Sequence, residues 1–266
     1  MAGQYLIDLY RSARDSGDPR TENMLLVREP LYVVGLILAY LFIVIKGPQW
    51  MAKREGFELR KPLIVYNFFL VALSGWMMYE FFVTTVLNPT FNFWCEPVNP
   101  SDVSDIQMRQ IRVSWVYFIS KIIEFMDTFF FILRKKSRQI TFLHVYHHTS
   151  VLMMQWLVTK HVPGAIGCLA GMLNCFIHVV MYSYYMLAAF GPHMQKYLWW
   201  KRYLTKMQII QFVLVFLHTS YAIQLDCGFS KGFLWSLWLY MLTLFMLFSH
   251  FYKQAYTVKP KDKKME

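Results

Sequence analysis

Seven apolar stretches, each close to the length needed to cross a lipid bilayer, constrain the fold of this chain more than any other feature. A hydrocarbon core about 30 Å thick requires roughly 20 mostly apolar residues per helix. We therefore expect an all-α integral membrane protein with seven transmembrane helices. The hydrophobic fraction of 56% agrees, because a water-exposed surface requires more polar residues. The stretches cover residues 31–45, 63–87, 113–133, 142–159, 164–190, 203–225 and 232–251.

Charged residues sort the connections between these stretches into two sides. Positive charge gathers on the cytosolic side of membrane proteins, and 18 of the 27 Lys and Arg residues fall in alternate connections and the tail. We therefore expect a luminal N-terminal segment at 1–30, a membrane domain at 31–252 and a cytosolic basic tail at 253–266. Residues 1–30 contain no apolar core, so the first span is expected to act as the insertion signal. Membrane insertion explains the net charge of +11, and we expect no nucleic-acid partner.

The four cysteines provide an independent test of this topology. Cys95 and Cys227 fall in luminal connections, where the redox conditions permit a disulfide. Cys168 and Cys175 fall within the fifth stretch. We predict a disulfide between Cys95 and Cys227, with two free thiols as the alternative.

The last four residues, Lys263-Lys264-Met265-Glu266, resemble the dilysine retrieval signal of endoplasmic reticulum membrane proteins. Such a signal acts in the cytosol, on the side that the charge distribution predicts for the tail. A short basic tail is also what charge asymmetry alone produces. We expect a multi-pass protein of the endoplasmic reticulum membrane.

Ionisable side chains near the centre of a bilayer cost about 2.5–3.5 kcal/mol each on insertion scales, so each requires a partner or a function. In the third stretch, Lys121, Glu124 and Asp127 repeat at helical spacing and share a face with Thr128. Lys121 is expected to pair with Glu124 or Asp127, since burying either charge alone costs far more. The alternative is that these residues form a purely structural ion-pair network.

Further polar residues follow in the next three stretches. The fourth contains the pattern His-x-x-His-His, formed by His144, His147 and His148. On the expected topology the polar faces of all four helices lie in the cytosolic half of the membrane, and we predict that they line one water-accessible chamber. The fifth and sixth stretches contribute Asn174, His178, Met181, Tyr182, Tyr185, Thr205, Gln208 and Gln211.

A histidine box also begins the di-iron sites of membrane desaturases and hydroxylases, which is the main alternative. Those sites use many more histidines, whereas here four can converge: His144, His147, His148 and His178. A mononuclear zinc site is a second alternative, and a seven-span receptor or transporter is the non-enzymatic one. We expect no metal, because a neutral imidazole is itself a competent nucleophile or base near neutral pH.

Four motifs resemble, in order and spacing, those of the very-long-chain fatty acid elongase family. They begin at Lys121 (K-I-I-E-F-M-D-T), Leu143 (L-H-V-Y-H-H), Asn174 (N-C-F-I-H-V-V-M-Y-S-Y-Y) and Thr205 (T-K-M-Q-I-I-Q-F). The likeness extends over residues 20–256, and Phe125 stands where leucine is commoner in the family. It implies a fold in which six of the seven helices form an inverted barrel around a narrow acyl tunnel.

The resemblance also implies the chemistry. The family's members are acyltransferases, 3-ketoacyl-CoA synthases that condense a long-chain or very-long-chain acyl-CoA with malonyl-CoA, release CO₂ and CoA, and so begin fatty acid elongation. We predict that His147 takes the acyl group as an acyl-histidine, oriented by His144 or His148 and by the carboxylates of the third stretch. His178 and Asn174 are predicted to stabilise the enolate formed from malonyl-CoA. A general-base role of His147, without an adduct, is the alternative.

Predictions about substrates and partners follow from the same resemblance. We expect acyl-CoA and malonyl-CoA as substrates, with no cofactor. The resemblance suggests homodimers and contacts with the ketoacyl reductase, dehydratase and enoyl reductase of the elongation cycle. Cytosolic basic residues are candidates for holding the CoA phosphates. The predicted substrate-binding residues are Tyr182, Tyr185, Thr205, Gln208, Gln211, Arg134, Lys135, Lys136 and Lys201.

Overall fold

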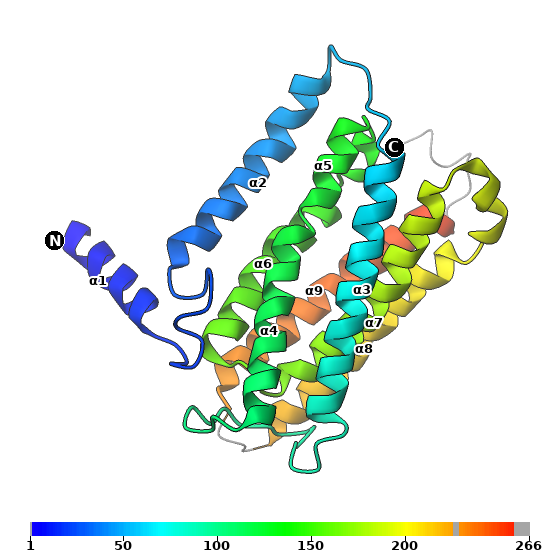
Figure 1. The fold of residues 1–266 in the computed structure, drawn as a ribbon. Helices are drawn as coiled ribbons and strands as arrows, with labels where there is room; N and C mark the ends of the chain where they lie inside the picture. Colours follow the sequence, from blue (N-terminus) through cyan, green and yellow to red (C-terminus); the bar gives the residue numbers. More distant parts are fainter. Residues whose placement is uncertain (1, 226–228, 258–266) are drawn as a thin grey trace. The chain divides into compact units, whose positions relative to one another are not determined.

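The computed structural model describes residues 2–225 and 229–257, and the regular elements in these ranges are all helices (Figure 1). The α-helices are α1 (Ala2–Asp15), α2 (Pro30–Met51), α3 (Arg60–Thr85), α4 (Asp105–Ile123), α5 (Met126–Leu133), α6 (Phe142–His161), α7 (Gly167–Ala189), α8 (Lys201–Gln224) and α9 (Lys231–Tyr256). Two short 3₁₀ helices, η1 (Ser137–Gln139) and η2 (Pro192–Tyr197), lie in connections.

Five of the described helices are long and apolar enough to cross a membrane, namely α2, α3, α7, α8 and α9. They coincide with the first, second, fifth, sixth and seventh predicted stretches, so the described residues confirm the all-helical fold class and five helices that fit a multi-pass membrane protein. The fourth predicted stretch is helical as α6, and the third is divided between α4 and α5. Membrane crossing by these two stretches stays a prediction, as does the inverted barrel.

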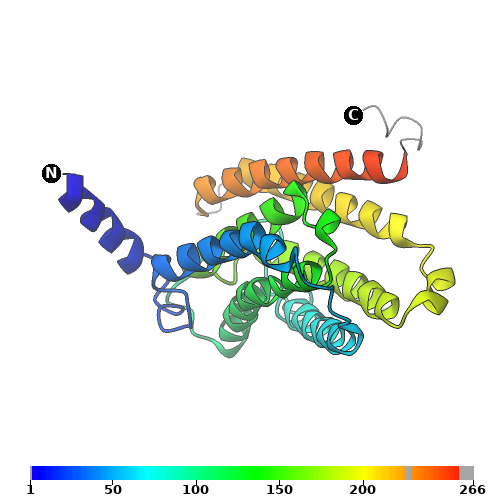
Figure 2. The same cartoon turned by 90° about the horizontal axis from the view of Figure 1, so that it is seen from above.

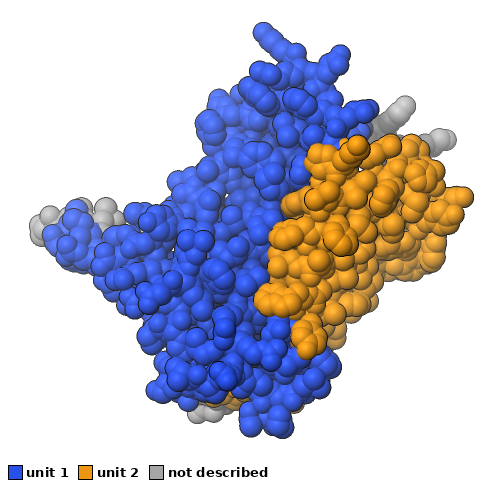
Figure 3. Space-filling model, viewed as in Figure 1, with its two compact units in different colours: residues 1–59, 80–91, 98–168 blue, residues 60–79, 92–97, 169–266 orange. Residues whose placement is uncertain are grey.

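The chain divides into two compact units (Figure 3). Unit 1 comprises residues 1–59, 80–91 and 98–168, and unit 2 comprises residues 60–79, 92–97 and 169–266. Each unit has a core of its own. Unit 1 contains the motif of α4 and α5 and the histidine box of α6, whereas unit 2 contains the polar residues of α7 and α8.

In unit 1, α2 packs against α5 and α6, and α4 packs along α6. α2 begins with Pro30, a first-turn position where the missing N–H removes no intrahelical bond. α6 begins after Thr141, whose hydroxyl oxygen accepts a hydrogen bond from the His144 N–H at 3.2 Å. The core of unit 1 consists of Val27, Val33, Tyr40, Phe118, Phe125, Leu152 and Trp156.

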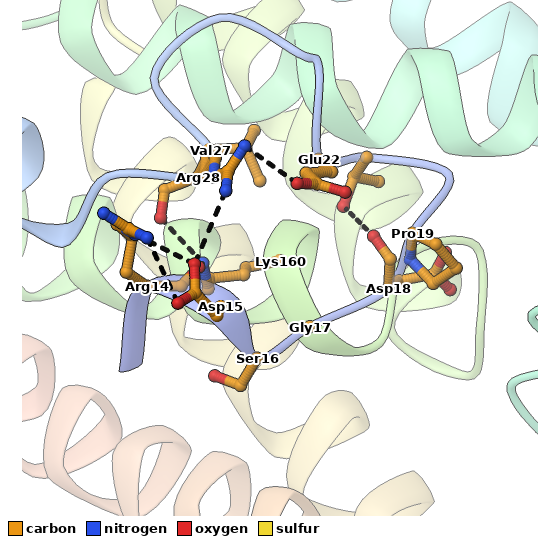
Figure 4. Close-up of a pocket in the computed structure, with 11 residues that line it drawn as sticks. Arg14, Asp15, Ser16, Gly17, Asp18, Pro19, Glu22, Val27, Arg28 and Lys160 are labelled. Carbon is orange, nitrogen blue, oxygen red and sulfur yellow. Dashed lines mark hydrogen bonds and ion pairs between the residues drawn. The ribbon is translucent and has the colours of Figure 1, made fainter. Parts of the chain in front are cut away.

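The segment between α1 and α2 is tied to the C-terminal end of α6 (Figure 4). Lys160 Nζ donates to the carbonyl oxygens of Arg14 at 2.9 Å and Arg28 at 2.8 Å. The Asp18 N–H donates in turn to the Lys160 carbonyl oxygen at 2.7 Å, and Asp18 forms a 2.6 Å ion pair with Arg20. The segment before the first predicted span is therefore anchored in unit 1, while α1 extends away from the other helices of that unit (Figures 1 and 2).

In unit 2, α8 and α9 lie side by side along their length (Figure 2). A second core, formed by Ile177, Tyr184, Leu198 and Leu204, joins α7, η2 and α8. The turn after α7 contains Gly191 with φ +114°, and a Cβ there would lie 2.9 Å from a guanidinium nitrogen of Arg60. Glycine therefore suits this turn for both its backbone freedom and its lack of a side chain.

Candidate active site

The junction between α4 and α5 shapes the first polar cluster of unit 1. The N–H groups of Phe125, Asp127 and Thr128 bond to the carbonyl oxygens three residues earlier, at 3.1–3.2 Å. Such bonds wind the backbone more tightly than an α-helix. The predicted single helix at 113–133 was therefore wrong at this point, because the chain ends α4 at Ile123 and begins α5 at Met126.

A buried ion pair stands at this junction. Lys121 Nζ lies 2.9 Å from Glu124 Oε1, and the two side chains are 1% and 3% exposed. The ammonium also lies 4.4 Å from the ring centre of Tyr117. The pairing of Lys121 with Glu124 was one of the two predicted choices, while Asp127 lies partly exposed in the first turn of α5.

The histidine box occupies the first two turns of α6 in the same unit. The rings of His144 and His148 lie 4.4 Å apart, and those of His147 and His148 lie 5.4 Å apart. His148 is buried, and its Nδ1 has no hydrogen-bond partner among the described residues, whereas His144 and His147 are partly exposed. The three imidazoles therefore form one cluster, in which His148 is less accessible than the other two.

A hydrogen-bonded chain connects the box to α2 and α5. His144 Nε2 lies 2.7 Å from Thr128 Oγ1, which lies 2.9 Å from Tyr40 Oη. The Tyr40 ring stacks on Phe125, with ring centres 4.1 Å apart. Phe125 thus packs under Tyr40 at the position where the elongase motif more often has leucine.

Sequence reasoning missed Tyr40 because it stands in the apolar run L-I-L-A-Y-L-F-I-V-I, where an aromatic residue is most simply a packing group. Its one available signal is a hydroxyl in the middle of a span, which requires a hydrogen-bond partner.

Unit 2 brings the polar residues of α7 and α8 together. The rings of His178 and Tyr182 lie 5.5 Å apart, and Tyr182 also contacts Tyr185 with ring centres 6.1 Å apart. Gln208 Nε2 of α8 lies 3.8 Å from the sulfur of Met181 of α7. Tyr185 is 38% exposed. His178 is buried, and three further predicted residues of this unit are buried or partly buried: Asn174, Thr205 and Gln211.

The structure thus groups the predicted site residues in two sets. In unit 1 the motif of α4 and α5 meets the histidine box through the bond between Thr128 and His144. In unit 2 the polar residues of α7 meet those of α8. The chamber lined by all four polar faces stays a prediction.

The basic residues predicted to hold CoA phosphates are exposed, and one of them has another contact. Lys135 Nζ donates to the carbonyl oxygens of Ala52 at 3.2 Å and Arg54 at 2.9 Å, near the end of α2. Its backbone has φ +55°, a left-handed conformation. Arg134 and Lys136 flank it, and Lys201 begins α8. Phosphate binding by these residues stays a prediction.

The predicted disulfide and the metal alternative concern the remaining ligand-type residues. Cys95 is disulfide-bonded, whereas Cys168 and Cys175 are buried thiols outside any disulfide. Cys227 lies outside the described residues, as do Lys263 and Lys264 of the predicted retrieval signal, so the pairing and the signal stay predictions. Within the described ranges, no group of three or more His, Cys, Asp or Glu residues is arranged to hold a metal ion.

Comparison with known proteins decides the family. A family model described as GNS1/SUR4 matches residues 25–264, which include both sets of site residues. The chain belongs to the GNS1/SUR4 family. The resemblance drawn from the four motifs is therefore confirmed at the level of the family.

Curated relatives of the GNS1/SUR4 family support the same assignment. The chain is 44% identical to the human very long chain fatty acid elongase 1, over 95% of this chain and 91% of that protein. It is 47% identical to the very long chain fatty acid elongase 5 of Tachysurus fulvidraco, over 91% of this chain and 81% of that protein. It is 44% identical to the very long chain fatty acid elongase 7 of Drosophila melanogaster, over 97% and 80%.

Proposed function

We propose that this protein elongates fatty acids by condensing a long-chain or very-long-chain acyl-CoA with malonyl-CoA. The relatives that carry the name of very long chain fatty acid elongases support the substrate class. The observation that carries the chemistry is the imidazole cluster of α6, which is bonded to the buried polar residues of α5 among apolar helices. Imidazole in such a setting acts as a nucleophile or a base.

In the proposed first step, a ring nitrogen of His147 attacks the thioester carbonyl of the acyl-CoA. The carbon–sulfur bond breaks, CoA leaves as the thiolate, and the second ring nitrogen of His147 gives up its proton, so that free CoA and a neutral acyl-imidazole result. His147 suits this role because it is partly exposed, whereas His148 is buried. The alternative in which His147 acts as a general base without an adduct is distinguished by the experiment below.

In the second step malonyl-CoA loses its carboxylate as CO₂, and the electrons of the broken carbon–carbon bond form an enolate. The enolate carbon attacks the acyl group on His147, and the imidazole leaves and takes up one proton. The product is a 3-ketoacyl-CoA that is two carbons longer. His178 and Asn174 are proposed to stabilise the enolate oxygen, because hydrogen-bond donors placed at a developing charge lower the barrier. No cofactor takes part in this scheme.

The proposed setting is the endoplasmic reticulum membrane, with a luminal amino terminus and a cytosolic carboxyl terminus. The other proposed partners are a second copy of the chain and the ketoacyl reductase, dehydratase and enoyl reductase of the cycle. These enzymes would consume the 3-ketoacyl-CoA in turn. A glycosylation acceptor placed before α2 and another placed after α9 would test the orientation, since the proposal requires modification of the first alone.

The decisive experiment incubates the purified protein with a panel of acyl-CoAs, first without and then with labelled malonyl-CoA. We expect an acyl adduct on His147 in the first incubation, by peptide mass spectrometry, and release of labelled CO₂ in the second. The variant His147→Ala is expected to abolish both. An adduct on Cys175, or turnover without any adduct, would exclude the covalent scheme, and metal-dependent oxidation of the acyl chain would favour a membrane desaturase instead.

A further inference from the structure

Three side chains from three helices of unit 1 form a continuous hydrogen-bonded chain. Tyr40 of α2 contacts Thr128 of α5 at 2.9 Å, and Thr128 contacts His144 of α6 at 2.7 Å. Tyr40 is 2% exposed and Thr128 is fully buried. Among the described residues, Tyr40 Oη has no other hydrogen-bond partner, and Thr128 Oγ1 has none besides these two.

The number of available protons fixes the direction of this chain. Each hydroxyl carries one proton. If Tyr40 donates to Thr128, Thr128 donates to the lone pair of His144 Nε2, and every proton has an acceptor. If His144 Nε2–H donates instead, Thr128 either donates to Tyr40 or accepts from it, and in each case one of the two hydroxyl protons is left buried without an acceptor, which is unfavourable. A doubly protonated His144 likewise leaves one hydroxyl proton without an acceptor.

We propose that Tyr40 is a positioning residue of the active site, which acts through Thr128 to hold His144 as the neutral imidazole with its proton on Nδ1. The inference rests on the proposed function for its catalytic meaning, but the arrangement of protons follows from the three side chains alone. Tyr40 does not touch the reacting atoms in this scheme.

This proton arrangement separates the roles of the three box histidines. His144 has its Nε2 lone pair engaged by Thr128, so it offers an N–H donor and no base at that nitrogen. Its Nδ1–H stands on a ring 4.4 Å from the ring of His148. His148 is buried, which leaves the partly exposed His147 as the imidazole suited to act on the thioester. The hydrogen-bonded chain of Tyr40, Thr128 and His144 thus distinguishes between proton arrangements of the histidine box that the sequence left open.

The position of Tyr40 is itself well defined. Its ring stacks on Phe125 with an interplanar angle of 23°, at the junction where α4 ends and α5 begins. Thr128 lies in the first turn of α5, directly after that junction. The tight winding at residues 124–128 therefore sets where the threonine hydroxyl meets the tyrosine.

The test uses the full-length protein with ¹⁵N-labelled histidine, in lipid. The ¹⁵N signals of an imidazole distinguish a protonated ring nitrogen from an unprotonated one, and the variant His144→Gln assigns the pair that belongs to His144. We expect an unprotonated, hydrogen-bonded Nε2 and a protonated Nδ1 in the wild type. The variants Tyr40→Phe and Thr128→Val are expected to give a mixture of tautomers, whereas Thr128→Ser, which keeps the hydroxyl, restores the single form.

Kinetics supply the second readout. Tyr40→Phe is expected to lower kcat about fivefold to tenfold, the effect of one lost hydrogen bond, while KM for acyl-CoA stays within about twofold. Combining Tyr40→Phe with Thr128→Val should lower kcat no further than Thr128→Val alone, because both break the same chain. Tyr32→Phe removes a hydroxyl from the exposed Tyr32 of the same helix and is the matched control, with no expected effect.

Protonation of His144 at Nε2 in the wild type would overturn the inference, as would a Tyr40→Phe variant with an unchanged tautomer and unchanged kcat. Equal losses of kcat for Tyr40→Phe and Tyr32→Phe would also reject it. The ¹⁵N signals do not require turnover. A protein that fails to condense malonyl-CoA but shows the expected tautomer would therefore contradict the proposed function. It would not contradict the arrangement of protons set by Tyr40 and Thr128.

Discussion

The polar regions of the two units differ in the contacts that hold them. In unit 1 the contacts are an ion pair between Lys121 and Glu124 and a hydrogen bond from Thr128 to His144. In unit 2 they include the ring contact of His178 with Tyr182 and the amide of Gln208 beside a thioether. A buried ion pair that loses one partner leaves an uncompensated charge, which costs far more than the loss of a ring contact. Unit 1 thus contains a fully buried charge pair, which is costly to break, and we expect it to be sensitive to the loss of a single polar partner.

The largest expected effect tests whether unit 1 depends on its ion pair. Glu124→Gln leaves the Lys121 ammonium without its countercharge in a buried site, and we expect a loss of about 3–5 kcal/mol in the free energy of unfolding. Thermal unfolding in detergent measures it. Gln211→Leu, at a buried amide of unit 2, is expected to cost about 1 kcal/mol or less. Similar losses of unfolding free energy for Glu124→Gln and Gln211→Leu would show that unit 1 depends no more on its buried pair than unit 2 depends on its buried amide.

A second prediction separates the chemistry of the two units. His178→Ala is expected to slow condensation about 10²–10³-fold, because it removes a donor to the enolate, while the acyl adduct on His147 still forms. His147→Ala removes the adduct itself. Mass spectrometry without malonyl-CoA and CO₂ release with it measure the two steps. Loss of the adduct in His178→Ala would show that unit 2 is required for adduct formation as well as for condensation.

The smallest expected effect concerns the rigidity of unit 1 at the connection after α2. Lys135→Ala removes two hydrogen bonds to carbonyl oxygens, at a cost of about 1 kcal/mol, and alanine keeps the Cβ that lysine already has at this left-handed φ. Lys135→Gly is expected to cost less, because glycine favours a φ of +55°. Lys136→Ala is the control. A greater loss for Lys135→Gly than for Lys135→Ala would show that the backbone conformation contributes nothing.

The helices of this protein could be predicted largely from the sequence, because a membrane-spanning helix is recognised by its length and apolar composition. A buried ion pair of Lys121 could also be predicted, with Glu124 or Asp127 as its partner, because a charge in an apolar run requires an opposite charge nearby; the structure shows Glu124. The family followed from four motifs in order. These features depend on residues that are close together in the chain, so they can be predicted without knowledge of packing.

Features that depend on packing escaped prediction. The junction at Phe125 depends on bonds three residues apart that hydropathy does not encode. The role of Tyr40 requires knowing that α2 packs against α5. The hydrogen bonds from the Lys135 ammonium to the carbonyl oxygens of Ala52 and Arg54 also require knowing how the connections after α2 and α5 pack together, while phosphate binding by Lys135 stays a prediction.

The anchoring of the amino-terminal segment has a consequence for biosynthesis. Lys160 follows Arg14 by 146 residues and Arg28 by 132. At a translation rate of about 5–20 residues per second, the ribosome delivers Lys160 about 7–30 s after Arg14. The beginning of the chain must therefore wait, undocked, while the helices between it and the end of α6 are made. The amino-terminal segment can therefore be anchored to α6 only late in synthesis.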